Sequence, residues 1–130
     1  MLTSKNIPLT HEHLVVRALV ARPPVSVDEI VLWATALVEN GLQMSFLHAP
    51  IGAYCADEGN KGCTVVAILN SSHLAIHVWD ESRPALIQLD VYSCKALNMG
   101  KVLQHLDAFS TTEMQYKLFD RSTNIIEVTP

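Results

Sequence analysis

Alternation of apolar and polar positions is most regular in the middle of the chain. Residues 72–79, SHLAIHVW, place leucine, isoleucine and valine at every second position, and this pattern predicts a strand. Residues 85–94, ALIQLDVYSC, alternate in the same way and predict a second strand. Turn-forming residues at 82–84 lie between them, so we expect a hairpin that returns Cys94 to the side of Ser72.

The rest of the chain predicts further strands and two helices. Ser26 suits the N-cap of a helix, because acidic residues and then an apolar face at helical spacing follow it as far as Gly41. The segment 49–62, rich in glycine and charge, predicts the longest loop. The other predicted elements are strands at 13–21, 42–47, 63–69, 113–119 and 124–128 and a helix at 99–109. Together they predict an α+β two-layer sandwich, with an antiparallel sheet and two helices on one face.

Composition is that of one folded domain covering residues 1–130. Apolar residues make up 49% and charged residues 17%, which excludes a disordered chain. The low charged fraction favours a buried subunit interface, so we expect a homodimer. A net charge of −4 without a basic cluster argues against nucleic acid as a partner. No apolar run approaches the ~20 residues of a membrane span, so no membrane partner is expected.

Cysteine usage and the N-terminus predict a cytoplasmic protein. Three cysteines lack zinc-ribbon spacing, and the first residues lack an apolar signal core. His11 and His13 share one side of the predicted first strand, but no third ligand has recognisable spacing, so no metal site is predicted. A hydrolase built on Ser72, His77 and Asp90 is disfavoured, because no G-x-S-x-G elbow is present.

Polar residues on the hairpin carry a more specific pattern. Ser72 is followed by two histidines, a tryptophan and, on the next strand, an Asp-x-x-x-Cys step, while a threonine lies eight positions before it. This pattern resembles the prokaryotic pyruvoyl-dependent S-adenosylmethionine decarboxylases. The residues that match are Thr64, Ser72, His73, His77, Trp79, Glu81, Asp90 and Cys94. The resemblance also implies the two-layer fold predicted above.

Three departures mark the chain as a divergent member of that family. Ser71 stands where the family has a glutamate before the serine, and Lys95 stands where a glycine follows the cysteine. The family's Phe-x-Pro-x-Gly segment, which carries a ring that stacks on adenine, is longer and altered here. Tyr54 is the candidate replacement for that ring.

The resemblance implies self-cleavage between Ser71 and Ser72, giving chains 1–71 and 72–130 and a pyruvoyl group derived from Ser72. Its ketone forms a Schiff base with the substrate amine and serves as the cofactor. By the same resemblance, Thr64 assists the acyl shift and His77 removes the serine α-proton. Ser72 and His77 have opposite parity on an unbroken strand, so their cooperation requires a bend or cleavage.

The remaining implied roles concern the decarboxylation itself. Cys94 returns a proton to carbon, and Glu81 and Tyr54 bind the substrate. The predicted function is therefore a lyase that decarboxylates S-adenosylmethionine for polyamine and spermidine biosynthesis, made as a zymogen. Two alternatives stay open: a pyruvoyl-dependent decarboxylase of arginine or ornithine, motivated by the altered adenine segment, and an unprocessed homologue acting as a binding or regulatory subunit, motivated by Ser71.

Overall fold

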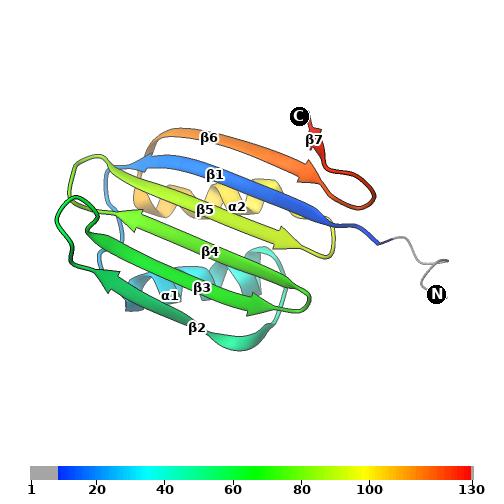
Figure 1. Cartoon of the computed structure of the whole chain (residues 1–130), viewed down its shortest axis with the longest axis horizontal. Coiled ribbons are helices and arrows are strands. Elements are labelled where there is room, and N and C mark those ends of the chain that lie inside the picture. The colour runs from blue at the N-terminus through cyan, green and yellow to red at the C-terminus, as the bar shows by residue number, and fades with distance from the viewer. Residues whose placement is uncertain (1–8, 130) are drawn as a thin grey trace.

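A seven-stranded antiparallel sheet forms the centre of the computed structural model, which describes residues 9–129 (Figure 1). The strands are β1 (Glu12–Val20), β2 (Phe46–Cys55), β3 (Gly62–Leu69), β4 (Ser72–Trp79), β5 (Ala85–Ser93), β6 (Thr111–Asp120) and β7 (Ile126–Val128). Their order in the sheet is β2-β3-β4-β5-β1-β6-β7. The first strand therefore lies in the interior of the sheet, between β5 and β6.

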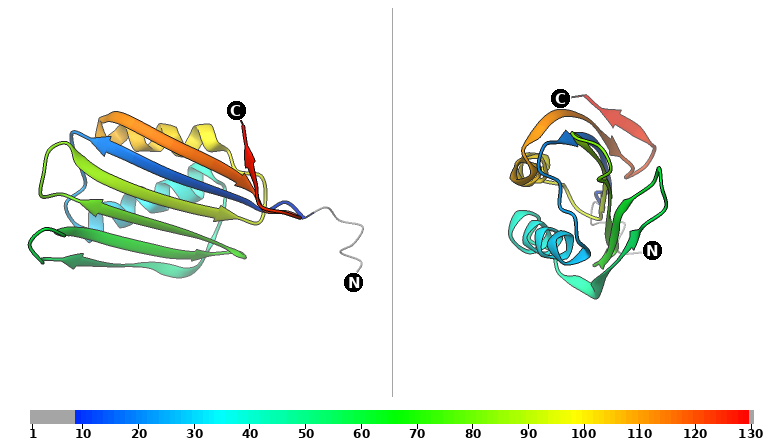
Figure 2. Two further views of the ribbon diagram at one scale, coloured as in Figure 1. Left: turned by 45° about the horizontal axis from the view of Figure 1, so that its top comes forward. Right: turned by 90° about the vertical axis from the view of Figure 1, so that its left-hand side faces the viewer.

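Two helices, α1 (Val27–Ala36) and α2 (Met99–Leu106), lie on one side of the curved sheet (Figure 2). Short η2 (Leu37–Gly41) and η3 (Asp107–Phe109) segments extend them. Along β5, Ile87, Leu89 and Val91 are at most 2% exposed and face the helices. The alternate residues of β5 point to the opposite side, which none of the helices within residues 9–129 covers and which is called the open face below. This architecture confirms the predicted α+β two-layer sandwich.

Helix α1 starts as the sequence predicts. The Ser26 hydroxyl accepts a hydrogen bond from the Glu29 backbone N–H at 3.1 Å, which satisfies a free donor of the first turn. Ile30 and Trp33 are buried against the sheet. The Trp33 indole N–H donates to the carbonyl oxygen of His105 at 2.8 Å, so the end of α2 is tied to α1.

The segment between α1 and β3 differs in structure from the sequence prediction. The predicted strand at 42–47 is wrong except for its last two residues, because β2 runs through Phe46–Cys55, and of the predicted loop at 49–62 only residues 56–61 are loop. Pro50 and Gly52 resemble loop residues, but an edge strand tolerates a proline because its outer N–H groups need no partner. A Cβ at Gly52 would lie 2.7 Å from side-chain atoms of Val27 and Val65, so glycine allows β2 to approach α1.

The other boundaries agree with the predictions to within a few residues. The predicted strands at 13–21, 113–119 and 124–128 correspond to β1, β6 and β7, and the helix at 99–109 corresponds to α2 with η3. None of the helices within residues 9–129 is long and apolar enough to cross a membrane. The prediction about the N-terminal signal concerns residues 1–8, which lie outside the described part of the chain.

Candidate active site

Ser72 and Cys94 are in contact at one end of the β4–β5 hairpin, as the sequence predicts. Ser72 opens β4, is 7% exposed, and points toward the helix side of the sheet. Its Oγ accepts a hydrogen bond from the Cys94 backbone N–H at 2.9 Å. The Cys94 thiol donates to the carbonyl oxygen of Asn70 at 3.3 Å. A candidate nucleophile and a candidate acid therefore lie together beside the turn that precedes β4.

That turn holds the peptide bond that the resemblance marks for cleavage. Leu69 pairs directly with Ser72, so only Asn70 and Ser71 connect β3 to β4. Ser71 has a φ of 51°, in the left-handed region where a side chain clashes with the backbone. Such residues store of the order of 1–2 kcal/mol of strain. The strained residue therefore contributes the carbonyl carbon that Ser72 would attack.

Thr64 and His77 form a second pair on the neighbouring strands. They lie directly opposite each other on β3 and β4, and the Thr64 hydroxyl is 2.9 Å from Nδ1 of His77. Both are half-buried on the open face. The Trp79 ring shares that face, with its centroid 5.9 Å from that of His77. Hydroxyl, imidazole and indole thus form one continuous surface.

The two pairs do not meet within the chain. β4 pairs regularly with both neighbours from end to end, without a bulge that would bend it. Ser72 and His77 are five residues apart, which corresponds to about 17 Å along a strand at ~3.3 Å per residue. Their side chains also leave opposite faces of the sheet. The bend that their cooperation would require is absent from the uncut chain.

Glu81 and Tyr54 lie at the same end of the hairpin as His77. The Glu81 carboxylate accepts hydrogen bonds from the backbone N–H groups of Gly59 and Lys61, both at 3.2 Å, and these bonds lower the pKa of Glu81. Partial desolvation, with the nearby Asp80 carboxylate, raises the pKa of the Tyr54 hydroxyl, which donates to Asp80 at 3.2 Å. Glu81 therefore holds the β2–β3 loop, and Tyr54 ties the end of β2 to the loop that follows β4.

Trp79 is a candidate ring that the sequence reading did not assign to substrate binding. Tyr54 pairs with Cys63, so its side chain leaves the sheet on the side opposite to Thr64 and His77. Trp79 lies on their side. Strand parity was the available signal, because Trp79 is two residues after His77 and shares its face.

These features define the class: a two-layer α+β sandwich whose candidate chemistry centres on a hairpin serine. The family model described as S-adenosylmethionine decarboxylase matches residues 29–122, and the chain belongs to this family. Among solved structures, the chain is similar to the adenosylmethionine decarboxylase from Aquifex aeolicus VF5, with a TM-score of 0.71 and 17% identity. The alignment covers 94% of this chain and 97% of that chain, so the whole fold is shared. No curated protein sequence matches the chain. Membership of the family implies a decarboxylase.

Proposed function

We propose that this protein is a pyruvoyl-dependent decarboxylase of S-adenosylmethionine that cleaves itself between Ser71 and Ser72 and serves polyamine synthesis in the cytoplasm. The contact between Ser72 and Cys94 beside a strained turn, in a chain of this family, is the observation that carries the proposal. A serine held in that position fits the origin of a pyruvoyl group.

Processing needs only the chain's own atoms and water. The Ser72 Oγ adds to the carbonyl carbon of Ser71, the peptide C–N bond breaks, and an ester joins the two residues. Loss of the Ser72 α-proton and of the Ser71 carboxylate leaves dehydroalanine at position 72. Water then displaces ammonia and leaves the pyruvoyl ketone. The Cys94 backbone N–H orients the attacking oxygen, and strain at Ser71 is released when the peptide breaks.

Cys94 is the proposed acid of the decarboxylation. The pyruvoyl ketone, once formed, supplies the electron sink for a substrate amine. The Cys94 thiol lies beside the turn and is half-buried, with its proton directed to the carbonyl oxygen of Asn70. Cleavage after Ser71 frees that turn, and the thiol then faces the space beside residue 72. Thiols in general are mostly protonated at neutral pH, which suits a group that returns a proton to carbon.

We infer further that a complete site lies between two copies of the chain. The Thr64–His77 pair of one protomer is too far from its own Ser72 to act there, so a second copy must supply that pair. Antiparallel stacking of two open faces would bring the His77 end of one hairpin over the Ser72 end of the other, and the break after Ser71 would free residue 72 to turn from the helix side toward that face. Ile51, Val66 and Ile68 favour this, because these apolar residues are 57%, 45% and 55% exposed on the open face.

S-adenosylmethionine remains the proposed substrate because of the groups gathered near His77. Each Glu81 oxygen holds one backbone hydrogen bond, which leaves lone pairs for the two ribose hydroxyls. Trp79 offers an aromatic surface on the side of His77, and Tyr54 offers a second ring on the other side of the sheet. The alternative substrate, arginine or ornithine, is favoured by the altered adenine segment, since a plain amino acid needs no stacking ring.

Intact mass and carbon dioxide release test the proposal. We expect fragments 1–71 and 72–130, the second blocked by pyruvate, and faster release from S-adenosylmethionine than from arginine, ornithine or lysine. Fragments with activity only on a basic amino acid would keep the pyruvoyl mechanism and change the substrate. A single uncut mass after long incubation, without decarboxylation, would overturn the proposal in favour of a binding or regulatory subunit.

A further inference from the structure

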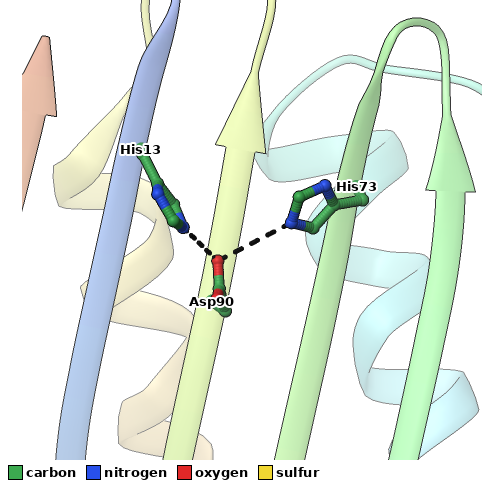
Figure 3. A group of neighbouring side chains, drawn as sticks. All are labelled: His13, His73 and Asp90. Atoms are coloured by element: carbon green, nitrogen blue, oxygen red, sulfur yellow. Dashed lines mark hydrogen bonds and ion pairs between the residues drawn. The ribbon is translucent and has the colours of Figure 1, made fainter. Parts of the chain in front are cut away.

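The open face carries two histidines that converge on one carboxylate. His13 on β1 and His73 on β4 reach from either side of β5 toward Asp90 (Figure 3). Nε2 of His13 is hydrogen-bonded to Oδ1 of Asp90, and Nε2 of His73 is 3.8 Å from the same oxygen. All three candidate ligand atoms lie within 4.8 Å of one another. Neither His13 nor His73 has a role in the reaction proposed above.

We propose that His13, His73 and Asp90 bind a divalent transition-metal ion, with zinc as the best match. Two imidazole nitrogens and one carboxylate oxygen form a donor set that zinc accepts, at bond lengths of roughly 2.0–2.2 Å. A central ion with such bonds needs ligand atoms about 3–4 Å apart, which small side-chain rotations provide here. The three side chains are 21%, 52% and 42% exposed in the single chain, so water, or a donor from a second copy stacked on this face, can complete the coordination.

Strand register places the two imidazoles rigidly. His13 and His73 both lie directly opposite Tyr92, one on each neighbouring strand. The Tyr92 ring stacks on His73 at 5.6 Å between centroids and meets His13 edge-on at 6.0 Å. The Tyr92 hydroxyl is in turn bonded to Nδ1 of His11 at 2.7 Å. Ligands from three paired strands with packed rings lose little freedom when an ion binds.

The contact between Arg121 and His13 should compete with metal binding. Its guanidinium lies 5.2 Å from the Tyr92 ring centroid, with Nη1 3.4 Å from Nδ1 of His13. Arginine only donates, so His13 accepts at Nδ1 and carries its proton on Nε2, toward Asp90. An ion at Nε2 shifts that proton to Nδ1 and breaks the contact with Arg121. Removal of the guanidinium should therefore strengthen metal binding, whereas removal of a ligand should weaken it.

The test measures zinc binding without substrate. Metal-free wild type and Ser72→Ala, in which the predicted nucleophile is absent, are titrated with Zn²⁺ by calorimetry and with Co²⁺ by visible absorption. We expect one ion per chain. His73→Gln and Asp90→Asn should each weaken binding at least about 10–100-fold. Mutation of residues that only hydrogen-bond to metal ligands already causes a loss of that size, and these two substitutions remove ligands. Arg121→Gln should tighten it, and His48→Gln, an exposed histidine on β2, should leave it unchanged.

Several results would overturn the site. One is the absence of stoichiometric Zn²⁺ binding by the wild type. Another is wild-type Zn²⁺ affinity in a His73→Gln variant whose metal-free thermal unfolding midpoint equals that of the wild type, which shows that the variant is folded. A near-ultraviolet thiolate band on Co²⁺ binding would assign the ion to cysteine instead. Failure of self-cleavage affects none of these outcomes, because Ser72→Ala carries the same three ligands. The metal site and the decarboxylase proposal therefore stand or fall separately.

Discussion

The two ends of the β3–β4 hairpin are built for different tasks. At the turn end, Ser72 is buried, hydrogen-bonded to Cys94 and joined to a strained residue. At the other end, Thr64 and His77 pair on the open face beside an aromatic ring. The turn end suits chemistry on the chain's own peptide, and the far end suits contact with another molecule.

The difference between the two ends shows that a straight strand can separate the residues of one sequence motif in space. Residues of one motif, close in sequence, are separated by length and by parity when the strand stays straight. Ser72 and His77 are separated in both ways. Under the proposal above, a shared reaction uses a second copy of the chain, and the mixed-dimer experiment below tests that arrangement.

Loss of the turn-end nucleophile should have the largest effect. Ser72→Ala removes the oxygen proposed to attack the carbonyl of Ser71, so we expect one uncut mass and no decarboxylation. Ser82→Ala, an exposed serine at the other end of β4, should be processed normally. Cleavage between Asn70 and Ser71 in the wild type would show that the register of the nucleophile is off by one residue.

Cys94→Ala separates cleavage from turnover. Its backbone N–H still orients Ser72, so fragments should appear, while decarboxylation falls by about 10²–10⁴-fold, the usual value of general acid help. The control is Cys55→Ala, because that thiol is exposed on β2. Normal turnover with clean product would remove Cys94 from the mechanism.

Mixed dimers test whether the two ends act across copies. Cys94→Ala breaks the turn end and His77→Ala breaks the far end, so each protein alone should be nearly inactive. Coexpression should restore about a quarter of wild-type activity, because about half of random dimers are mixed and each carries one intact site of two. Activity that stays at the sum of the two variants would place the reaction within one chain.

Strain at the turn should change the rate of cleavage. Ser71→Gly relaxes the left-handed φ, so it should slow processing several-fold and raise the unfolding free energy of uncut protein by up to about 1 kcal/mol. Gln43→Gly is the matched control, because Gln43 has a φ of 55° far from the cleavage point in the sequence. Equal cleavage rates in wild type and Ser71→Gly would exclude strain as a driving force.

The far end should show a small effect of pH on stability. Backbone hydrogen bonds from Gly59 and Lys61 lower the pKa of Glu81 in the folded protein below its usual 4.5. The unfolded chain therefore binds the Glu81 proton more tightly than the folded chain does, and protonation favours unfolding. Wild type should be more stable than Glu81→Gln above about pH 4.5, and this advantage should disappear as pH falls through the lowered pKa. Denaturant unfolding at several pH values measures it, with Glu58→Gln, a carboxylate in the same loop, as the control.

The sequence by itself determined the local parts of this protein. Alternation with a period of two placed Ser72, His77 and Cys94 on two strands, and the short turn between them brought Cys94 to Ser72. Capping chemistry located the start of α1 at Ser26. These features depend on residues close in the chain, where backbone geometry leaves few choices.

Only the tertiary structure decided the long-range arrangement. Edge position turned the segment around Pro50 and Gly52 into β2, where residue types alone predicted a loop. Insertion of β1 between β5 and β6 brought His13 to Asp90, 77 residues away. Which strands become neighbours depends on how helices and sheet bury their apolar faces together, and no short window of sequence contains that information.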